Sequence, residues 1–138
     1  MPLLVSIYLG LYLLLTLANG IYCLAGGIKV KTPMMVYEIV SGFLVVLMAA
    51  SLWVASLNSW VGIGASLALL LVVGIDMRLT IWGDADDLGV PTEEVGNIEL
   101  DVIKGISLAF AAPAYVMALM LAVDKLVPNA SKLFAFWH

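Results

Sequence analysis

The residues best able to do chemistry are charged side chains that lie inside or beside long apolar segments. Glu38 follows the start of one apolar segment, and Asp76 and Arg78 lie near the end of another. Lys29 precedes the first of these segments, and Lys104 lies at the start of a third. Because an ionisable residue within a membrane-spanning segment marks a functional site by default, we take these five residues as candidates for contact with a ligand or a partner.

Asp76 and Arg78 are two residues apart in the sequence, so on a helix their side chains point about 200° apart. Each therefore needs a partner of its own. For Arg78 we expect Glu38 or the acidic segment that follows. For Asp76 the expected partners are Lys104, Lys29 and Thr80. Two roles stay open: a half-buried ion network that fixes the register of the helices, or a site at Arg78 for a lipid head group, a quinone or an anionic substrate.

Polar side chains recur along the first apolar segment. Tyr8, Tyr12, Thr16, Asn19 and Cys23 follow one another at intervals of four, four, three and four residues, which places them on one face of a helix. The amide of Asn19 is the costliest of these groups in hydrocarbon, because it needs a hydrogen-bond partner. Asn19 is therefore a further contact candidate, either in a polar seam against a neighbouring helix or toward a ligand or cofactor.

Several classes of site are excluded by the residues present. One cysteine, Cys23, and one histidine, His138, rule out within this chain a disulfide, a thiolate metal cluster and a bis-histidine haem site. A calcium loop beginning at Asp84 fails, because Leu88 and Val95 stand where oxygen ligands are needed. We expect no metal, no catalytic residue and no cofactor bound by this chain alone, with a lipid or a quinone as the open alternative.

Four long apolar segments dominate the chain. Of its 138 residues, 64% are hydrophobic and only 12% are charged, and the mean hydropathy is +1.12. Soluble domains carry about 25% charged residues. Each segment is long enough to cross a bilayer as a helix, and the expected spans are approximately 3–26, 35–56, 60–82 and 102–123. Trp60 and Trp82 would lie about 33 Å apart on such a helix, close to the thickness of the hydrocarbon layer. We predict an all-α integral membrane four-helix bundle forming a single domain.

The breaks between these segments are short, apart from one. Gly26, Gly27 and Pro33 mark the end of the first segment, and Leu57–Ser59 reads as a tight polar turn. Pro113 should kink the fourth segment and free the carbonyl of the residue four positions earlier. The first segment carries no preceding basic residue and no cleavage motif, so we expect it to be retained as a span rather than removed as a signal peptide.

Two hydrophilic or interfacial regions lie outside the spans. Seven of the ten acidic residues fall between Asp84 and Asp101, within an acidic loop at 83–101. The tail at 124–138 ends in aromatic residues, which favour a membrane interface or a partner surface. The partner-docking candidates are Asp84, Asp86, Asp87, Phe134, Phe136 and Trp137. The net charge of −4 gives no indication of a nucleic-acid surface, and the expected partners are other integral membrane subunits and lipid.

Four antiparallel spans place alternate connections on opposite sides of the membrane. The segment around Lys29 and the acidic loop share one side, and both termini share the other with 57–59. The distribution of basic residues favours a cytoplasmic location for the first side. Small residues indicate where spans pack closely. The expected packing faces are Gly42 with Val45, Ala49 and Glu38, Gly62 with Ser66, and Gly105 with Ala109 and Ala112.

Two sequence patterns carry a family resemblance. Leu24–Lys29 reads LAGGIK and is soon followed by Pro33, and Glu38–Gly42 reads EIVSG. Together with the small-residue-rich third span, these resemble the A-G-x-x-K and E-x-x-x-G patterns of the DoxX-like family of small four-span membrane proteins, over roughly residues 9–75. The resemblance implies association with a membrane redox complex, such as thiosulfate:quinone oxidoreductase, and puts Glu38 and Lys29 at motif positions. The acidic loop departs from the family pattern.

The expected function is that of a non-catalytic accessory or structural subunit of a larger membrane complex, of which a respiratory or redox complex is one type. The first alternative is a DoxX-like redox component that binds a quinone or a small anion at Glu38, Asp76 and Arg78. The second alternative is a small transporter that forms its path by oligomerisation. The expected location is the inner or cytoplasmic membrane of a bacterium or an archaeon, with several spans.

Overall fold

A computed structural model describes residues 2–26, 31–83 and 97–127 of the chain. Within these residues the secondary structure is entirely helical. The helices are α1 (Leu3–Leu24), α2 (Thr32–Ser51), α3 (Ala55–Trp60), α4 (Ile63–Trp82) and α5 (Asn97–Leu126). All except α3 are long and apolar enough to cross a membrane. The predicted all-α four-helix bundle is confirmed, and its apolar helices indicate a multi-pass integral membrane protein.

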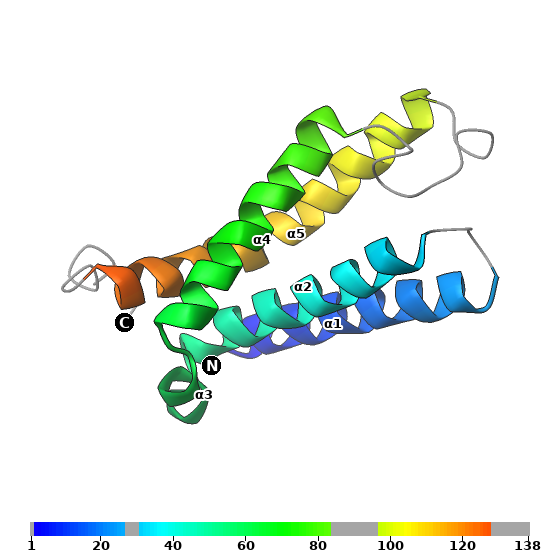
Figure 1. Cartoon of the computed structure of the whole chain (residues 1–138). Coiled ribbons are helices and arrows are strands. Elements are labelled where there is room, and N and C mark those ends of the chain that lie inside the picture. The colour runs from blue at the N-terminus through cyan, green and yellow to red at the C-terminus, as the bar shows by residue number, and fades with distance from the viewer. Residues whose placement is uncertain (1, 27–30, 84–96, 128–138) are drawn as a thin grey trace.

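The long helices form two antiparallel pairs, α1 with α2 and α4 with α5 (Figure 1). The N-terminus, α3 and the end of α5 lie at one end of the molecule, which we call the α3 end. The ends of α1 and α4 and the starts of α2 and α5 lie at the other, which we call the charged end because it carries Glu38, Arg78 and Lys104. The predicted alternation of the spans is thus confirmed for the described residues.

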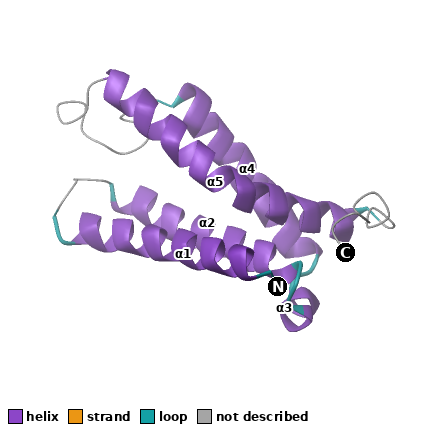
Figure 2. Cartoon of the chain, turned by 180° about the vertical axis from the view of Figure 1, so that it is seen from behind, coloured by secondary structure: helices purple, strands orange, loops and turns teal. Residues whose placement is uncertain are grey.

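The two helix pairs pack together at the α3 end and diverge toward the charged end (Figures 1 and 2). Burial follows the same division. The buried residues of α4 are Ser66 and Leu69, both in its first half. Among the described side chains of α5, at 101–126, the buried residues all lie within 114–122. Between residues 70 and 82, and between 101 and 113, no residue is buried. The main hydrophobic cluster therefore lies toward the α3 end, where Val45, Met48 and Ala49 of α2 pack with residues of the other long helices. Met35, at the start of α2, is buried outside this cluster.

Two glycines allow α1 and α2 to approach closely. A Cβ atom added to Gly42 would lie 2.8 Å from Cγ2 of Thr16, and one added to Gly20 would lie 2.8 Å from Cδ1 of Ile39. Those distances are too short for real contacts, so a side chain at either position would force its neighbour to shift. The end of Ile39 can move more easily than the short, branched side chain of Thr16, so the need for glycine is stronger at Gly42. The predicted α2 face is buried at Gly42, Val45 and Ala49, whereas Glu38, which was expected on the same face, is exposed.

The prediction for the packing face of α5 is wrong. Gly105 and Ala109 are exposed, and Ala112 is only partly buried. The small residues that α5 buries are instead Ala114, Ala118 and Ala122. The reason is the divergence of the helix pairs, which moves the first half of α5 away from α2. A Cβ atom added to Gly62 would meet nothing within 4 Å, so this glycine is not at a close helix contact, although its expected companion Ser66 is buried.

The predicted boundary between the second and third spans is also corrected. The second span ends at Ser51 rather than at 56, and Leu57–Ser59 belongs to the short helix α3 instead of a tight turn. Trp60 is the last residue of α3, and the third span begins at Ile63. The side-chain amide of Asn58 donates to the carbonyl of Ser51 at 3.2 Å, which satisfies one of the open acceptors at the end of α2.

A lysine from α5 holds this short helix in place. The ammonium group of Lys125 donates to the backbone carbonyl of Asn58 at 3.2 Å and also to its side-chain oxygen. Asn58 thus receives hydrogen bonds from α5 and gives one to the end of α2. The helix of the fourth span, α5, runs from Asn97 to Leu126, and its candidate membrane span from Asp101 to Leu126 is slightly longer than predicted at both ends. The first span ends at Leu24. Gly26, two residues later, has a φ of 87°, the left-handed conformation that commonly ends a helix.

Candidate functional site

Asp76 lies where three helices meet. It is in α4, six residues before Trp82, which is about 9 Å along the helix axis. One carboxylate oxygen, Oδ1, accepts a hydrogen bond from the hydroxyl of Tyr37 in α2 at 2.6 Å. The other, Oδ2, accepts one from the hydroxyl of Tyr115 in α5. We call these three residues the aspartate junction. It connects the α1–α2 pair to the α4–α5 pair through side chains that the sequence separates widely.

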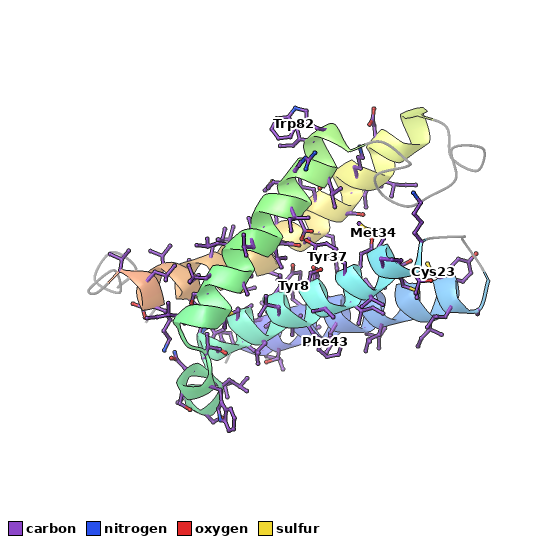
Figure 3. All side chains as sticks on the ribbon, in the orientation of Figure 1. Tyr8, Cys23, Met34, Tyr37, Phe43 and Trp82 are labelled. Atoms are coloured by element: carbon purple, nitrogen blue, oxygen red, sulfur yellow. The ribbon has the colours of Figure 1, made fainter. Side chains whose placement is uncertain are left out.

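Each oxygen of the carboxylate accepts a hydrogen bond from one phenol, and no cation of the described residues pairs with it. Tyr37 also lies 3.4 Å from the carbonyl of Val72, a longer contact than the one to Asp76. All three junction residues are partly buried. A polar group in a membrane interior is costly unless it is hydrogen-bonded. The two hydrogen bonds to Asp76 therefore hold α2 and α5 against α4. Figure 3 shows Tyr37 directed from α2 toward the α4–α5 pair.

A second tyrosine contact lies beside the junction, at the proline of α5. Pro113 lacks a backbone N–H and its ring crowds the preceding turn, so the helix bends there; α5 changes direction between its yellow and orange parts in Figure 1. The hydroxyl of Tyr8 donates to the carbonyl of Phe110 at 2.7 Å and accepts from the backbone N–H of Ala114 at 3.2 Å. In an unbroken helix these two backbone groups would pair with each other. Tyr8 is therefore inserted at the bend.

Aromatic rings surround this contact. The ring of Phe110 lies 5.8 Å from that of Tyr8 and 5.9 Å from that of Tyr12, with the second pair stacked at 12°. Tyr8 and Tyr12 are themselves 6.3 Å apart. Such separations are favourable for aromatic pairs. They hold α1 against α5 immediately before the helix pairs begin to diverge.

The structure does not bring the other charged candidates to Asp76. Glu38 and Arg78 are both exposed, and the described residues contain no ion pair between them. Arg78 is two positions from Asp76 and points to the outside of α4. The predicted pairing of Asp76 with Lys104 is wrong, because the ammonium of Lys104 donates to the carbonyl of Gly83 at the end of α4. The predicted bond from Asp76 to Thr80 is replaced by the two tyrosine contacts.

Asn19 is exposed even though it shares a helix face with Tyr8 and Tyr12. Those two tyrosines contact α5, whereas Asn19 lies farther along α1, where the helix pairs have diverged. The predicted polar seam is therefore only half formed: Tyr12 is buried, and Thr16 and Cys23 are partly buried. The remaining candidates lie outside the described residues, namely Lys29, Asp84, Asp86, Asp87, Phe134, Phe136 and Trp137.

The tyrosines of the junction were absent from the predicted site. Oppositely charged side chains were the expected partners of Asp76, and tyrosine is a neutral donor. A usable signal was present nevertheless. Tyr115 lies in the middle of an apolar span, and a tyrosine hydroxyl at that depth needs an acceptor. Among the described residues, no group of histidine, cysteine and acidic side chains could hold a metal ion.

Comparison with known proteins gives no relative. No family model matches the chain, and no curated protein or solved structure matches it. The DoxX-like resemblance accordingly receives no support from them. Functional inference for this protein therefore depends on the geometry of its own residues.

Proposed function

We propose that this protein is a non-catalytic accessory subunit of a larger membrane complex, completed by a helix of another integral membrane subunit. The observation that carries this proposal is the divergence of the two helix pairs. Residues 70–82, 13 of the 20 residues of α4, and residues 101–113, 13 of the 30 residues of α5, include no buried residue. Exposed surface on these segments, other than the outer face of α4, is available for contact with a partner helix at the charged end.

Exposed polar groups at the charged end support the same proposal. Asn19 and Glu38 are exposed, and hydrogen bonds to Asn19 or ion pairs to Glu38 are lacking among the described residues. Within a membrane such groups favour contact with another polar group. Asp76, by contrast, has both oxygens occupied by the chain's own tyrosines. The junction thus fits a structural role, and the exposed groups fit contact with a partner.

Finer features of the proposal come from the sequence. The complex is of redox or respiratory type if the DoxX-like resemblance reflects common descent. The membrane is then the cytoplasmic membrane of a bacterium or an archaeon. Docking contacts beyond the spans come from the acidic loop and the aromatic tail, through Asp84, Asp86, Asp87, Phe134, Phe136 and Trp137.

Mild extraction from the native membrane tests the proposal. The protein is extracted in a mild detergent from cells that express it at its natural level, then separated on a native gel and analysed by mass spectrometry. We expect it in a complex of defined composition that is much larger than the 14.7 kDa chain. Migration as a monomer or a homodimer in several mild detergents would contradict an accessory role.

Matched variants show whether the charged end makes the contact. Asn19→Leu and Glu38→Gln should reduce the fraction of protein in the complex. Tyr22→Phe, which removes an exposed hydroxyl from the same helix as Asn19, should leave that fraction unchanged. The melting temperature of the isolated protein should be the same for all three variants, because none of these side chains is buried.

A second candidate is favoured by the chemistry of the aspartate junction. A carboxylate with two phenols at membrane depth can exchange hydrogen bonds with a small polar ligand, and a quinone remains the alternative that the family resemblance suggests. Lipid extracts of the purified protein distinguish the two functions. A stoichiometric quinone that disappears in Asp76→Leu but persists in Asp101→Leu would favour the ligand-binding role over the accessory role.

A further inference from the structure

We infer that Arg78 and Trp82 bind the phosphate group of a membrane phospholipid on the outer face of α4. This face differs from the surface proposed for a partner subunit, and lipid binding there does not depend on the accessory function. Arg78 lies on the side of α4 opposite Asp76, so it points away from the other helices. Both Arg78 and Trp82 are exposed, and Trp82 is 76% exposed.

The residues around Arg78 form a surface suited to lipid chains. Leu71, Ile75, Arg78 and Trp82 follow at intervals of four, three and four residues, so they share one face of the helix, and all are exposed. Gly74 adds no bulk on this side, since a Cβ placed there would meet nothing within 4 Å. Arg78 is the one charged residue on this face of α4. The surface is aliphatic on the N-terminal side of Arg78, at Leu71 and Ile75, and carries Trp82 on the C-terminal side.

The depth of Arg78 determines what it can contact. It is one turn, or about 6 Å along the axis, from Trp82 at the end of the helix. An arginine side chain is long enough to extend toward the interface from that depth. Trp82 marks the level of the head groups, where tryptophan is enriched. The guanidinium therefore reaches the layer that contains lipid phosphates.

The charge of Arg78 requires an anion. A guanidinium stays protonated in proteins, so it cannot become neutral on a lipid-facing surface. Within the described part of the chain it forms no ion pair, and Asp76 is occupied on the opposite side of α4. The planar guanidinium matches a phosphate group through two parallel hydrogen bonds. A phospholipid supplies both this phosphate and the acyl chains that fit beside Leu71 and Ile75.

Native mass spectrometry of the delipidated protein tests the assignment. The probes are dioleoyl phosphatidylglycerol, dioleoylglycerol, which has the same chains without phosphate, and inorganic phosphate. We expect one tightly retained phosphatidylglycerol on the wild type and none of the diacylglycerol. Arg78→Gln should weaken retention by about tenfold, as expected for loss of a charge-assisted pair, and Arg78→Lys should give an intermediate loss. Trp82→Ala should also weaken retention.

Matched controls distinguish a lipid site at Arg78 from general charge attraction, from a free anion and from a pair within the chain. Lys31→Gln removes another exposed cation at the charged end and should leave retention unchanged; an equal loss there would show general charge attraction and overturn the assignment. Protection of the protein from heat by inorganic phosphate alone would identify a free anion instead of a lipid. Unchanged lipid retention in Arg78→Gln, with a lower melting temperature of the lipid-free protein, would show that Arg78 pairs within the chain.

Discussion

Asp76 accepts one hydrogen bond on each carboxylate oxygen, and the donors belong to different helices. A carboxylate inside a membrane is usually suspected of binding a ligand or a proton. Here two tyrosines of the same chain occupy it, and the contact joins α2 and α5 to α4. The main role of these three residues is therefore structural: they connect the helices.

Removing one phenol of the junction should weaken the fold. Tyr115→Phe deletes a single oxygen and leaves the ring, so Asp76 loses one donor and little packing changes. Polar contacts between helices in membranes contribute about 0.5–2 kcal/mol, and we expect a fall of that size in the free energy of unfolding. It is measured by thermal or denaturant unfolding in detergent micelles. Tyr22→Phe is the matched control, because its hydroxyl is exposed; equal stability of the two variants would contradict the junction.

The sequence revealed only part of this site. Asp76 could be selected because an acid within an apolar span is rare, and this needed no knowledge of the fold. Its partners could not be deduced in the same way. Tyr37 and Tyr115 lie 39 residues from Asp76 on either side, and only the packing of three helices brings them together. Glu38 and Arg78 were expected near one another because both are charged and lie at the same end, yet both are exposed on the structure.

At the scale of the helix, Pro113 and Tyr8 act together. The proline bends α5, and the tyrosine hydroxyl contacts both the carbonyl of Phe110 and the N–H of Ala114. The sequence predicted the bend, since a proline inside a helix cannot complete the backbone ladder. It could not predict that α1 would supply the hydroxyl, because that depends on how the first and fourth spans cross.

The bend and the tyrosine should be energetically coupled. Tyr8→Phe should lower the free energy of unfolding by about 1 kcal/mol when Pro113 is present. In the Pro113→Ala background the helix can pair Phe110 with Ala114 itself, so the same substitution should cost much less. A double-mutant cycle by thermal unfolding measures the coupling. Additive effects of the two substitutions would show that Tyr8 does not serve the bend.

The close approach of α1 and α2 at Gly42 gives a second test at this scale. Gly42→Val would force the new side chain against Thr16, and overpacking of this kind costs about 1–3 kcal/mol. Gly74→Val makes the same change in the middle of α4, where the added atoms meet open space. We expect a lower melting temperature for the first variant only. A similar decrease for both would attribute the loss to helix propensity rather than to packing.

At the scale of the molecule, the number of spans and their alternation could be read from hydropathy, because each span must satisfy its own backbone in lipid. The divergence of the two helix pairs could not. It arises from contacts that are concentrated at one end, where Ala114, Ala118 and Ala122 lie within the core. The short helix α3 was not predicted for a similar reason, since its position depends on Asn58 and Lys125, which are 67 residues apart.

The aspartate junction fixes the two helix pairs relative to each other. Spin labels at Val36 in α2 and Ile81 in α4, both exposed, report this directly in a Cys23→Ala background. Their distance distribution is measured by pulsed electron paramagnetic resonance in lipid nanodiscs. We expect a narrow distribution for the parent and for Asp101→Leu, and a clearly broader one for Asp76→Leu. An unchanged distribution in Asp76→Leu would contradict the claim.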